Sequence, residues 1–599
     1  RKRLQNWREQ NPFINDYYWT QRLSLDGITE EGFLQLLEEP IETIGNRISP
    51  PVWLSEIKQA FAEMADNKYD TSILPPPEEL TDESMGFLYA VEPLIKEGFE
   101  ELEDKVQELI QTESYLPFDP EHIVSIMSVS LPEQLLWMLH RTLVLEINVA
   151  RLQGCLEGDT PLERFQHFIA SLRQHNKALA LLQEYPVLAR QIKICIDNWV
   201  KFSFEFLRHL CTDWHEISKM FSPEHELGQL VELQGSAGDS HKGGRSVLIA
   251  KFSSGLQIVY KPRSIAVDVH FQELLTWLNK RGNHPPFQTL KILERSSHGW
   301  VEFANASGCQ TKAEIERFYE RQGGYLALLY ALEATDFHSE NLIAVGEHPI
   351  LIDLEALFRA EFEQLDLMKS DLLAYKKMTY SVLSIGLLPQ RLYADGEYEG
   401  VDLSGLGSAQ GQLTPHKAPY LDKLGTDEIS LKRERVEIPG NNNRPTYDVK
   451  EINVLEYIDS LVAGFTNVYQ LLLKHRDELL AANSPLAKFA EDEVRAIIRP
   501  TYTYSLMLSE SFHPDVLRNA LDRDRLFDRL WLGIEQEPHL TKVIAAERND
   551  LWEGDIPLFT TKPNSRDLWS SSGERIADFF VESGLNLVQH RLQQMSETD

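Results

Sequence analysis

Residues 335–355, TDFHSENLIAVGEHPILIDLE, place side chains suited to phosphate and magnesium chemistry around one tight turn. Asp336, His338 and Asn341 lie within six residues, and Asp353 follows a short apolar run that predicts a buried strand. Magnesium prefers hard oxygen ligands from one or two side chains, which Asn341 and Asp353 can supply. A carboxylate such as that of Asp336 can orient or deprotonate an attacking hydroxyl group. The segment therefore indicates phosphoryl transfer.

The spacing of these residues is that of a kinase catalytic loop. Asp336 and Asn341 are five residues apart, as are the Asp and Asn of the protein-kinase motif H-R-D-x-x-x-x-N. Asp353 stands where a kinase has the Asp of D-F-G, although here the triplet is Asp-Leu-Glu and lacks the glycine. The position of His338 resembles lipid kinases more than protein kinases. Taken one at a time, the same residues also fit an N-capping Asp, a surface His and a capped buried Asp.

A glycine-rich stretch and a lysine precede this segment. Residues 235–247, GSAGDSHKGGRSV, contain Gly243 and Gly244, whose backbone N–H groups can approach an anion because glycine has no side chain. The stretch lacks the spacing of a P-loop and also fits a plain turn. Lys261 ends the apolar run IVYK, where burial is costly unless the ammonium group meets an anion such as phosphate. An exposed lysine at a sheet edge is the alternative.

Residues 494–508, VRAIIRPTYTYSLML, hold a third group of chemically useful side chains. We expect Arg495 and Arg499 to lie one helical turn apart, followed by Pro500 and by Thr501 at a helix break. Two guanidinium groups and a hydroxyl on one face would form a phosphate clamp. An Arg pair at this spacing is also common on solvent-exposed helices, and that interpretation stays open.

In this order, the motifs GDSHKGG, IVYKPRS, TDFHSENLI, LIDLEAL and RAIIRPTYTYSLML resemble the dehydratase domain of class II lanthipeptide synthetases, the LanM enzymes. The resemblance implies an α+β fold with a lipid-kinase-like bilobal core and extensive additional helices. It implies that the chain phosphorylates Ser and Thr of a precursor peptide carrying a leader sequence, using ATP and Mg²⁺. The same site would then eliminate phosphate to give dehydroalanine and dehydrobutyrine.

The resemblance also assigns residues to the two steps. Phosphorylation falls to Lys261, Asp336, His338, Asn341 and Asp353, and elimination falls to Asp239, His241, Arg495 and Thr501, with Arg499 as an additional cation. Within the first set we expect Lys261, together with Gly243 and Gly244, to bind ATP. Asn341 and Asp353 are expected to bind Mg²⁺.

One departure from the family concerns the end of the chain. A complete LanM enzyme continues into a cyclase domain that binds zinc through two cysteines and a histidine. The last cysteine here is Cys309 and the chain stops at Asp599, so we expect no cyclase domain, no zinc and no ring formation. The missing initiating Met suggests a trimmed chain. The four cysteines lack C-x-x-C spacing, which is typical of reduced cytoplasmic proteins.

The elements that must position these residues follow from the periodicity. Residues 1–230 are expected to be helical and to serve as a scaffold or a leader-docking surface. Residues 231–357 predict two strand hairpins around a helix, then a long helix at 313–334 that leads into the catalytic turn. Residues 358–450 form a loop-rich, activation-like segment, and helical patterning returns over 451–599.

Composition excludes several classes of function. The chain has 59 basic and 92 acidic residues, a net charge of −33, which disfavours binding to nucleic acid or to an anionic membrane. No apolar run approaches the roughly 20 residues that span a bilayer. The basic N-terminus has no apolar segment behind it and is therefore not a secretory signal. We expect a cytoplasmic protein, monomeric by default.

Two other functions stay open from the sequence. A kinase-like phosphotransferase could act on a protein, lipid or small molecule without elimination, and its product would gain phosphate rather than lose water. A degenerate kinase fold could serve as a binding scaffold, which the missing glycine after Asp353 favours. A scaffold has no need of Lys261, Asp336 and Asn341, which argues against this second alternative.

Overall fold

The computed structural model describes residues 1–66, 72–76, 79, 82–235, 239–362, 377–392, 400–407, 409, 411–448 and 450–598. Parts of the expected glycine-rich stretch and of the expected loop-rich segment lie outside these residues. The described chain mixes helices with small sheets, so the expected α+β class is confirmed. None of the described helices is both long and apolar enough to span a membrane.

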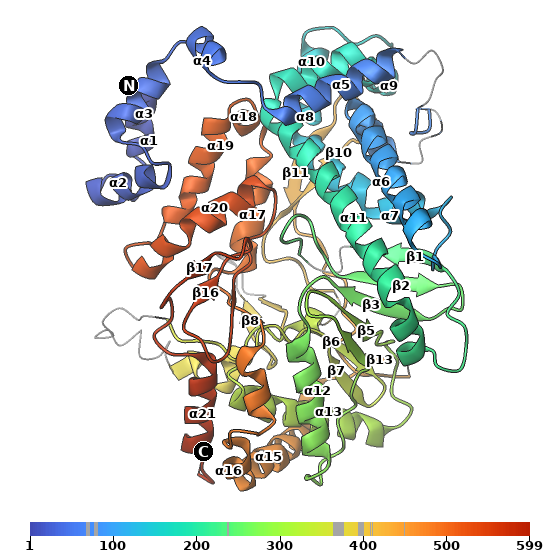
Figure 1. Ribbon diagram of the computed structural model, residues 1–599, viewed down its shortest axis with the longest axis vertical. Coiled ribbons are helices and arrows are strands. Elements are labelled where there is room, and N and C mark those ends of the chain that lie inside the picture. The colour runs from blue at the N-terminus through green and yellow to red at the C-terminus, as the bar shows by residue number, and fades with distance from the viewer. Residues whose placement is uncertain are drawn as a thin grey trace.

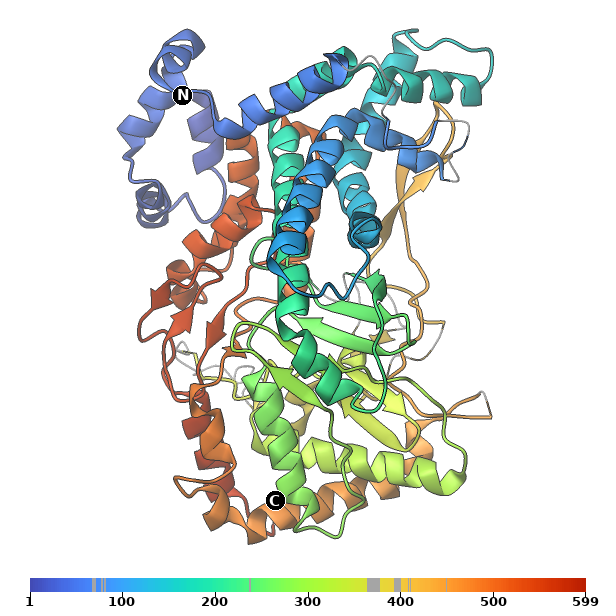
Figure 2. The same cartoon turned by 45° about the vertical axis from the view of Figure 1, so that its right-hand side comes forward.

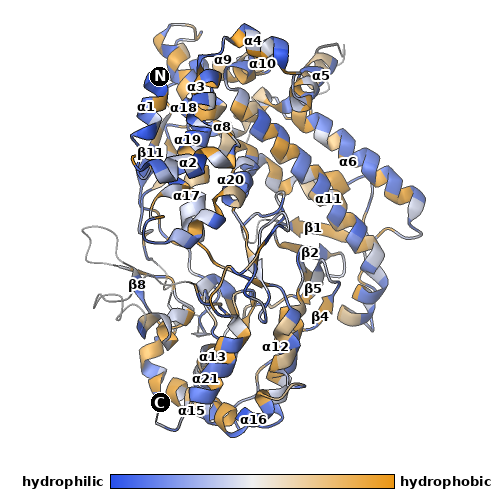
Figure 3. Cartoon of the chain, turned by 60° about the vertical axis from the view of Figure 1, so that its left-hand side comes forward, coloured by the Kyte–Doolittle hydropathy of each residue, from blue (hydrophilic) through white to orange (hydrophobic). Residues whose placement is uncertain are grey.

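The described residues up to 221 are mainly helical, as predicted. Its helices are α1 (Lys2–Arg8), α2 (Asp16–Leu25), α3 (Glu30–Glu38), α4 (Ile41–Arg47), α5 (Val52–Asp66), η2 (Glu83–Ala90), α6 (Glu92–Thr112), α7 (Ile123–Met127), η3 (Ser128–Ser130), α8 (Leu131–Leu152), α9 (Pro161–Leu172), α10 (His175–Glu184) and α11 (Pro186–Phe221). Residues 161–184 form two of these helices, α9 and α10. Figure 3 shows contrasting polar and apolar sides on α6 and α11, as expected for helices that bury one face.

A five-stranded antiparallel sheet follows, in the order β1-β2-β3-β5-β4. Its strands are β1 (Leu230–Gln234), β2 (Leu248–Phe252), β3 (Gln257–Lys261), β4 (Ile292–Glu294) and β5 (Gly299–Glu302). Both predicted hairpins are confirmed, β2 with β3 and β4 with β5. Figures 1 and 2 show α11 running from the helical region onto this sheet. There Phe206 packs against Tyr260 and Trp300, so the sheet and the helices share one apolar core.

A second core lies below the sheet in Figure 1. It is built by α12 (Ala266–Asn279), α13 (Lys312–Ala331), η4 (Ser339–Asn341), the hairpin of β6 (Leu342–Val345) and β7 (His348–Leu351), α15 (Ile458–Lys474), α16 (Arg476–Leu479) and η7 (Leu486–Glu491). Helices α13 and α15 approach closely because Gly323 and Gly464 face each other's helix. A Cβ at Gly323 would lie 1.8 Å from the Leu461 carbonyl oxygen, and one at Gly464 would lie 1.7 Å from that of Glu320.

Short strands and turns connect these two helices. They are η5 (Val382–Ile385), β8 (Arg391–Leu392), β9 (Val401–Asp402), β10 (Ala418–Asp422), β11 (Ser430–Glu434), β12 (Thr446–Tyr447), β13 (Lys450–Glu451) and η6 (Val454–Tyr457). The longest ribbon is the antiparallel pair of β10 and β11. Backbone hydrogen bonds from Phe337 to Ile385 and from Ser339 to Leu403 fasten the predicted catalytic turn to this segment.

The C-terminal region contains strands where helices were predicted. Residues 494–495 form β14 (Val494–Arg495), which belongs to a small sheet with β15 (Thr560–Thr561), β16 (Leu568–Trp569) and β17 (Arg575–Ile576). The remaining elements are α17 (Thr501–Ser511), α18 (Pro514–Leu517), α19 (Ala520–Phe527), η8 (Asp528–Trp531), η9 (Pro538–Lys542), α20 (Ile544–Trp552) and α21 (Gly584–Gln594). The prediction that one helix carries both Arg495 and Arg499 is therefore wrong, because β14 pairs with β15 instead.

The two ends of the chain share a third core. Helices α1, α2 and α3 lie beside α19 and α20 in Figure 1. Arg22, 1% exposed, forms ion pairs with Asp26, Asp524 and Asp528. Trp7 Nε1 donates to Asp528 Oδ2 at 2.6 Å. The first three helices thus brace the C-terminal region rather than the sheet.

Candidate functional site

Most of the predicted site residues line one cavity of about 680 Å³. Nine of the twelve contribute to its wall: Asp239, His241, Lys261, Asp336, His338, Asn341, Asp353, Arg495 and Thr501. They come from the loop before β2, the end of β3, the turn before β6, the segment after β7, and the β14–α17 connection. Gly243, Gly244 and Arg499 are not among the lining residues. Folding therefore joins the two predicted sets of residues, which lie up to 262 positions apart in the chain (239 to 501).

The turn before β6 holds its polar groups in a defined arrangement. Asp336 has a left-handed backbone (φ 67°), a conformation uncommon outside glycine and often found at functional sites. Asn341 Nδ2 donates to the Asp336 carbonyl at 2.7 Å, which leaves Asn341 Oδ1 as the atom able to bind a cation. His338 Nε2 lies 3.9 Å from Asp336 Oδ1. Burial raises the pKa of Asp336, against the opposing effects of His338 and Arg495, so the carboxyl group binds a proton more readily than usual.

Lys261 is buried rather than exposed at a sheet edge. Its side chain is 7% exposed, and Nζ donates to Asp268 Oδ1 and to the Ile352 carbonyl, both at 2.8 Å. Asp268 lies on the first turn of α12. The ammonium group thus joins β3, α12 and the residue before Asp353, which keeps it at the cavity wall next to that carboxylate.

Arg263 connects three carboxylates across the cavity. Its Nη2 lies 3.1 Å from Asp353 Oδ1, its Nε 3.1 Å from Glu355 Oε2, and its Nη1 3.5 Å from Asp268 Oδ2. Burial raises the pKa of Asp353, and Glu355 adds to this effect, while Arg263 and Lys261 oppose it. Sequence reasoning missed Arg263, Asp268 and Glu355. Two signals were available in the sequence: Arg263 lies two positions after Lys261, and Glu355 replaces the glycine of the D-F-G motif.

Arg495 is fixed by Glu355 and Thr501. Its Nη1 lies 2.9 Å from Glu355 Oε1, and its Nη2 donates to Thr501 Oγ1 at 3.1 Å. Burial alone would raise the pKa of Glu355, but Arg263 and then Arg495 outweigh it and lower the pKa to about 2. The carboxylate between the two guanidinium groups is therefore ionised at neutral pH.

Arg499 does not join this arrangement. It pairs with the buried Glu547, with Nε to Oε1 at 2.7 Å, and donates to the Leu530 carbonyl at 2.8 Å. Tyr504 Oη also donates to Glu547 Oε1. The predicted clamp of two guanidinium groups is therefore corrected to one, Arg495, because residues 494–500 do not form a helical face.

The glycine turn holds a carboxylate of the same chain instead of an open anion site. The N–H groups of Gly243 and Gly244 donate to Asp555 at 2.5 and 3.0 Å, which departs from the expected contact with ATP. His241 Nδ1 donates to the Ile556 carbonyl at 2.7 Å. Burial lowers the pKa of His241, and Arg495 adds to this effect, so the imidazole is neutral at pH 7 with Nε2 as its acceptor.

Part of the cavity lining is apolar. It is formed by side chains from the sheet and from the β6–β7 hairpin: Val247, Ile249, Val259, Val301, Phe303, Ile343 and Leu351. A flat organic group fits such an apolar surface.

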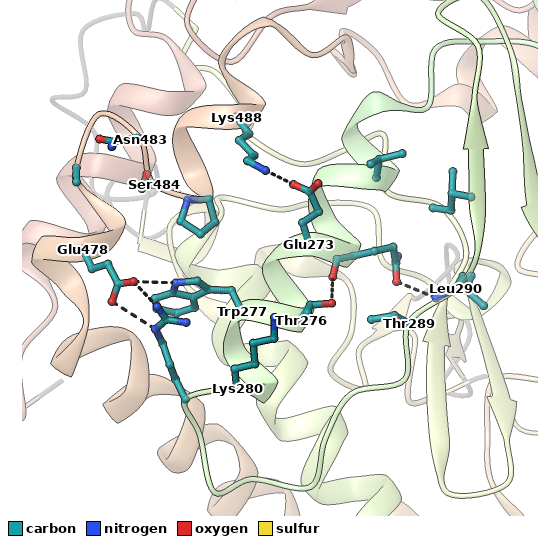
Figure 4. Close-up of a pocket in the computed structure, with 16 residues that line it drawn as sticks. Glu273, Thr276, Trp277, Lys280, Thr289, Leu290, Glu478, Asn483, Ser484 and Lys488 are labelled. Carbon is teal, nitrogen blue, oxygen red and sulfur yellow. Dashed lines mark hydrogen bonds and ion pairs between the residues drawn. The ribbon is translucent and has the colours of Figure 1, made fainter.

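A second cavity, of about 790 Å³, lies along α12 (Figure 4). There Lys488 Nζ lies 2.6 Å from Glu273 Oε2, and both Trp277 and Arg281 bind Glu478. The two cavities share Gln272, Leu290 and Ile292 in their walls. These contacts tie α12 to residues 478–488, and since α12 carries Asp268, they help to fix the partner of Lys261.

The donor set suits magnesium better than a metal held entirely by protein. No group of three or more His, Cys, Asp or Glu side chains within the described ranges could hold a metal ion. A magnesium ion needs only one or two protein oxygens, because phosphate and water complete its shell. Asn341 Oδ1 and the Asp353 carboxylate can supply them.

Comparison with known proteins adds a family and a relative. The family model described as a domain of unknown function (DUF4135) matches residues 185–562, more than half of the chain. The lacticin 481/lactococcin biosynthesis protein LcnDR2 of Lactococcus lactis subsp. lactis is 26% identical over 456 residues, covering 73% of this chain and 47% of the relative. The chain thus spans about half the length of that curated relative.

Proposed function

The chain belongs to the DUF4135 family, and from this premise we propose that it is a dehydratase of a ribosomally made precursor peptide in lanthipeptide maturation. It phosphorylates Ser and Thr from ATP and then eliminates phosphate in the same cavity. The relative's role in lacticin 481 biosynthesis supports a peptide substrate. Because the proposed reaction uses ATP, we place it in the cytoplasm, and we propose a monomeric enzyme.

Two steps make the dehydration feasible. Hydroxide is a poor leaving group, so direct loss of a Ser or Thr hydroxyl is slow, whereas phosphate leaves readily. In the first step the peptide Oγ attacks the γ-phosphorus of ATP, its proton passes to a base, and ADP leaves. In the second step a base removes the Cα proton, the freed electron pair forms the Cα–Cβ double bond, and the Cβ–O bond breaks as phosphate departs.

The first step uses the Lys261–Asp353 end of the cavity. The apolar lining suits adenine, and buried Lys261, held by Asp268, would bind the phosphates. Asp336, whose pKa burial raises, accepts the hydroxyl proton, with His338 beside it. Asn341 and Asp353 would hold Mg²⁺, which neutralises phosphate charge when bound. Two groups of elements support a lipid-kinase-like bilobal core. The five-stranded sheet and α12 would form one lobe, and α13 and the β6–β7 hairpin would belong to the other.

The second step uses Arg495, Thr501, His241 and Asp239. Arg495, already oriented by Glu355 and Thr501, stabilises the charge that develops on the departing phosphate. His241 presents a neutral Nε2 that can accept the Cα proton. Asp239 lies two residues away in the same loop and lines the same cavity. Removing one such preorganised cation slows a step by about 10²–10³-fold.

The observation that carries the proposal is one cavity wall that contains Lys261, Asp353, Arg495 and Thr501. The test is intact-mass measurement of precursor peptide, leader included, after incubation with the protein, ATP and Mg²⁺. We expect the loss of one water per modified site. Lys261→Ala and Asp353→Ala leave the peptide unmodified, whereas Arg495→Ala and Thr501→Ala leave it phosphorylated.

Other masses would contradict the proposal. A net gain of phosphate from the unsubstituted protein, without loss of water on longer incubation, identifies a kinase without elimination. An unchanged peptide, with no nucleotide-dependent change in thermal stability, identifies a binding scaffold.

A further inference from the structure

Asp555 takes the place at the glycine turn that an external anion was expected to occupy. Its Oδ2 accepts the N–H of Gly243 and its Oδ1 that of Gly244, so each oxygen binds one amide. Both glycines have positive φ, 86° and 74°, which points their N–H groups to one side of the turn. Asp555 is 5% exposed, and a buried carboxylate with two charge-assisted hydrogen bonds is a strong fastening.

The residue after Asp555 completes the attachment. The Ile556 N–H donates to the Ser240 carbonyl at 3.2 Å, and the Ile556 carbonyl accepts from His241 Nδ1 at 2.7 Å. Residues 555–556 thus make four hydrogen bonds to the loop 240–244. On its other side the loop is closed by Arg245, whose backbone pairs with that of His241 in both directions.

The backbone of Asp555 is in turn hydrogen-bonded to helix α20. Asp555 lies just past the end of α20, and its N–H donates to the carbonyl of Asp550, within that helix, at 3.0 Å. Helix α20 also carries Glu547, the buried partner of Arg499. The loop is therefore attached to a packed helix, and displacement of Asp555 would move the loop relative to Arg495.

We propose, on the basis of the proposed function, that Asp555 is a positioning residue for the elimination step, because it fixes the loop that presents His241 and Asp239 to the cavity. Attachment of Nδ1 at Ile556 leaves His241 Nε2 as the proton acceptor beside Arg495. The glycine turn serves this attachment and does not hold the phosphates of ATP. Among the described residues, no hydrogen bond or ion pair joins Asp555 to Lys261, Asn341 or Asp353, so phosphorylation does not depend on it.

Asp555→Asn is the informative substitution. The amide keeps one oxygen acceptor but presents an NH₂ group to the second glycine N–H, so one of the two contacts is lost at constant volume. A shift of about 1 Å in a reacting group costs about 10²-fold in rate. The matched control is Asp550→Asn, which alters a neighbouring carboxylate that binds Ser571 and not the loop.

The test measures the two steps separately. Elimination is followed from a precursor peptide that already carries phosphoserine, and phosphorylation from unmodified peptide with ATP and Mg²⁺. We expect Asp555→Asn to eliminate about 10²-fold more slowly, to phosphorylate at the normal rate, and to accumulate phosphopeptide. Asp550→Asn should match the unsubstituted protein in both assays. An unchanged elimination rate, or an equal loss of both steps, overturns the proposal.

Amide hydrogen exchange separates failure of this inference from failure of the proposed function. The peptide containing Gly243 and Gly244 should exchange faster in Asp555→Asn than in Asp550→Asn. If the unsubstituted protein modifies no peptide but the exchange difference is found, the attachment stands and the proposed function falls. If exchange in this peptide is unchanged, the inference is overturned whatever the activity.

Discussion

The carboxylate of Glu355 lies between two guanidinium groups, with Oε2 3.1 Å from Arg263 Nε and Oε1 2.9 Å from Arg495 Nη1. The Arg495 backbone N–H also donates to the Glu355 carbonyl at 2.7 Å. Arg263 contacts Asp353 as well, so a short path of ion pairs joins the two ends of the cavity. Asp353, proposed for the phosphorylation step, and Arg495, proposed for the elimination step, therefore belong to one network of ion pairs.

Glu355→Gln should impair elimination more than phosphorylation. The pKa of Glu355 is about 2, so its carboxylate is charged and orients Arg495. The amide keeps the shape of the side chain but removes this charge. We expect elimination from a phosphopeptide to slow by about 10²-fold. Single-turnover elimination assays measure this rate. Glu340→Gln is the control, because Glu340 lines the same cavity with its side chain 75% exposed. Equal elimination rates for the two variants would contradict the role of Glu355.

Local patterns in the sequence predicted the elements around the site well. The two hairpins, α12 and α13 were all expected from periodicity and turn residues, and the structure has them. Nine of the twelve predicted site residues line the cavity, although Asp239 and His241 were assigned through the family resemblance and not from their local pattern. What the hairpins and the two helices share is that a few neighbouring residues determine each of them.

Contacts between distant segments were not predictable in the same way. The bond between Asp555 and the glycine turn spans more than 300 positions, and an isolated Asp gives no local signal for it. Arg495 and Arg499 have helical spacing, but pairing of Val494 and Arg495 with Thr561 and Thr560 overrides it. Tertiary pairing of this kind regularly outweighs local propensity.

Arg499 should be a structural residue rather than a catalytic one. Its partner Glu547 is fully buried, so Arg499→Ala leaves an uncompensated charge and should reduce the free energy of unfolding by about 3–5 kcal/mol. Denaturant unfolding measures this loss. The activity of the remaining folded protein, corrected for its concentration, should be close to that of the unsubstituted chain. A stable Arg499→Ala protein that stalls at the phosphopeptide would restore Arg499 to the site.

Nucleotide binding should depend on magnesium through Asp353. A ligand that binds only the folded state stabilises it by about 2.7 kcal/mol at a hundredfold excess over the dissociation constant, and we expect this of ATP with Mg²⁺. We expect thermal unfolding to show this gain for the unsubstituted protein and to lose it when a chelator removes the metal. Asp353→Asn should need more Mg²⁺ for the same gain. A shift that is insensitive to both chelator and substitution would argue against Asn341 and Asp353 as the metal ligands.

Stability should fall in mild acid because of His209. Its ring stacks on His298 with centroids 3.6 Å apart, and Nδ1 contacts the Tyr260 hydroxyl. Burial, and then His298, lower the pKa of His209 to about 4, whereas an unfolded His titrates near 6.5. As the pH falls from about 6.5 to about 4, the unfolded state takes up a proton that the folded state does not, and stability is lost. For this partly exposed ring the loss is about 1–2 kcal/mol.

Urea unfolding at about pH 7.5 and about pH 5 measures this effect, and substitution of an exposed histidine serves as the control. His209→Gln removes the titrating ring and should lose less stability between the two pH values than the unsubstituted protein. His215→Gln, at an exposed position on the same helix, should keep the full dependence. If the unsubstituted chain and both variants lost the same free energy of unfolding between the two pH values, His209 would not be the cause of the loss of stability in acid.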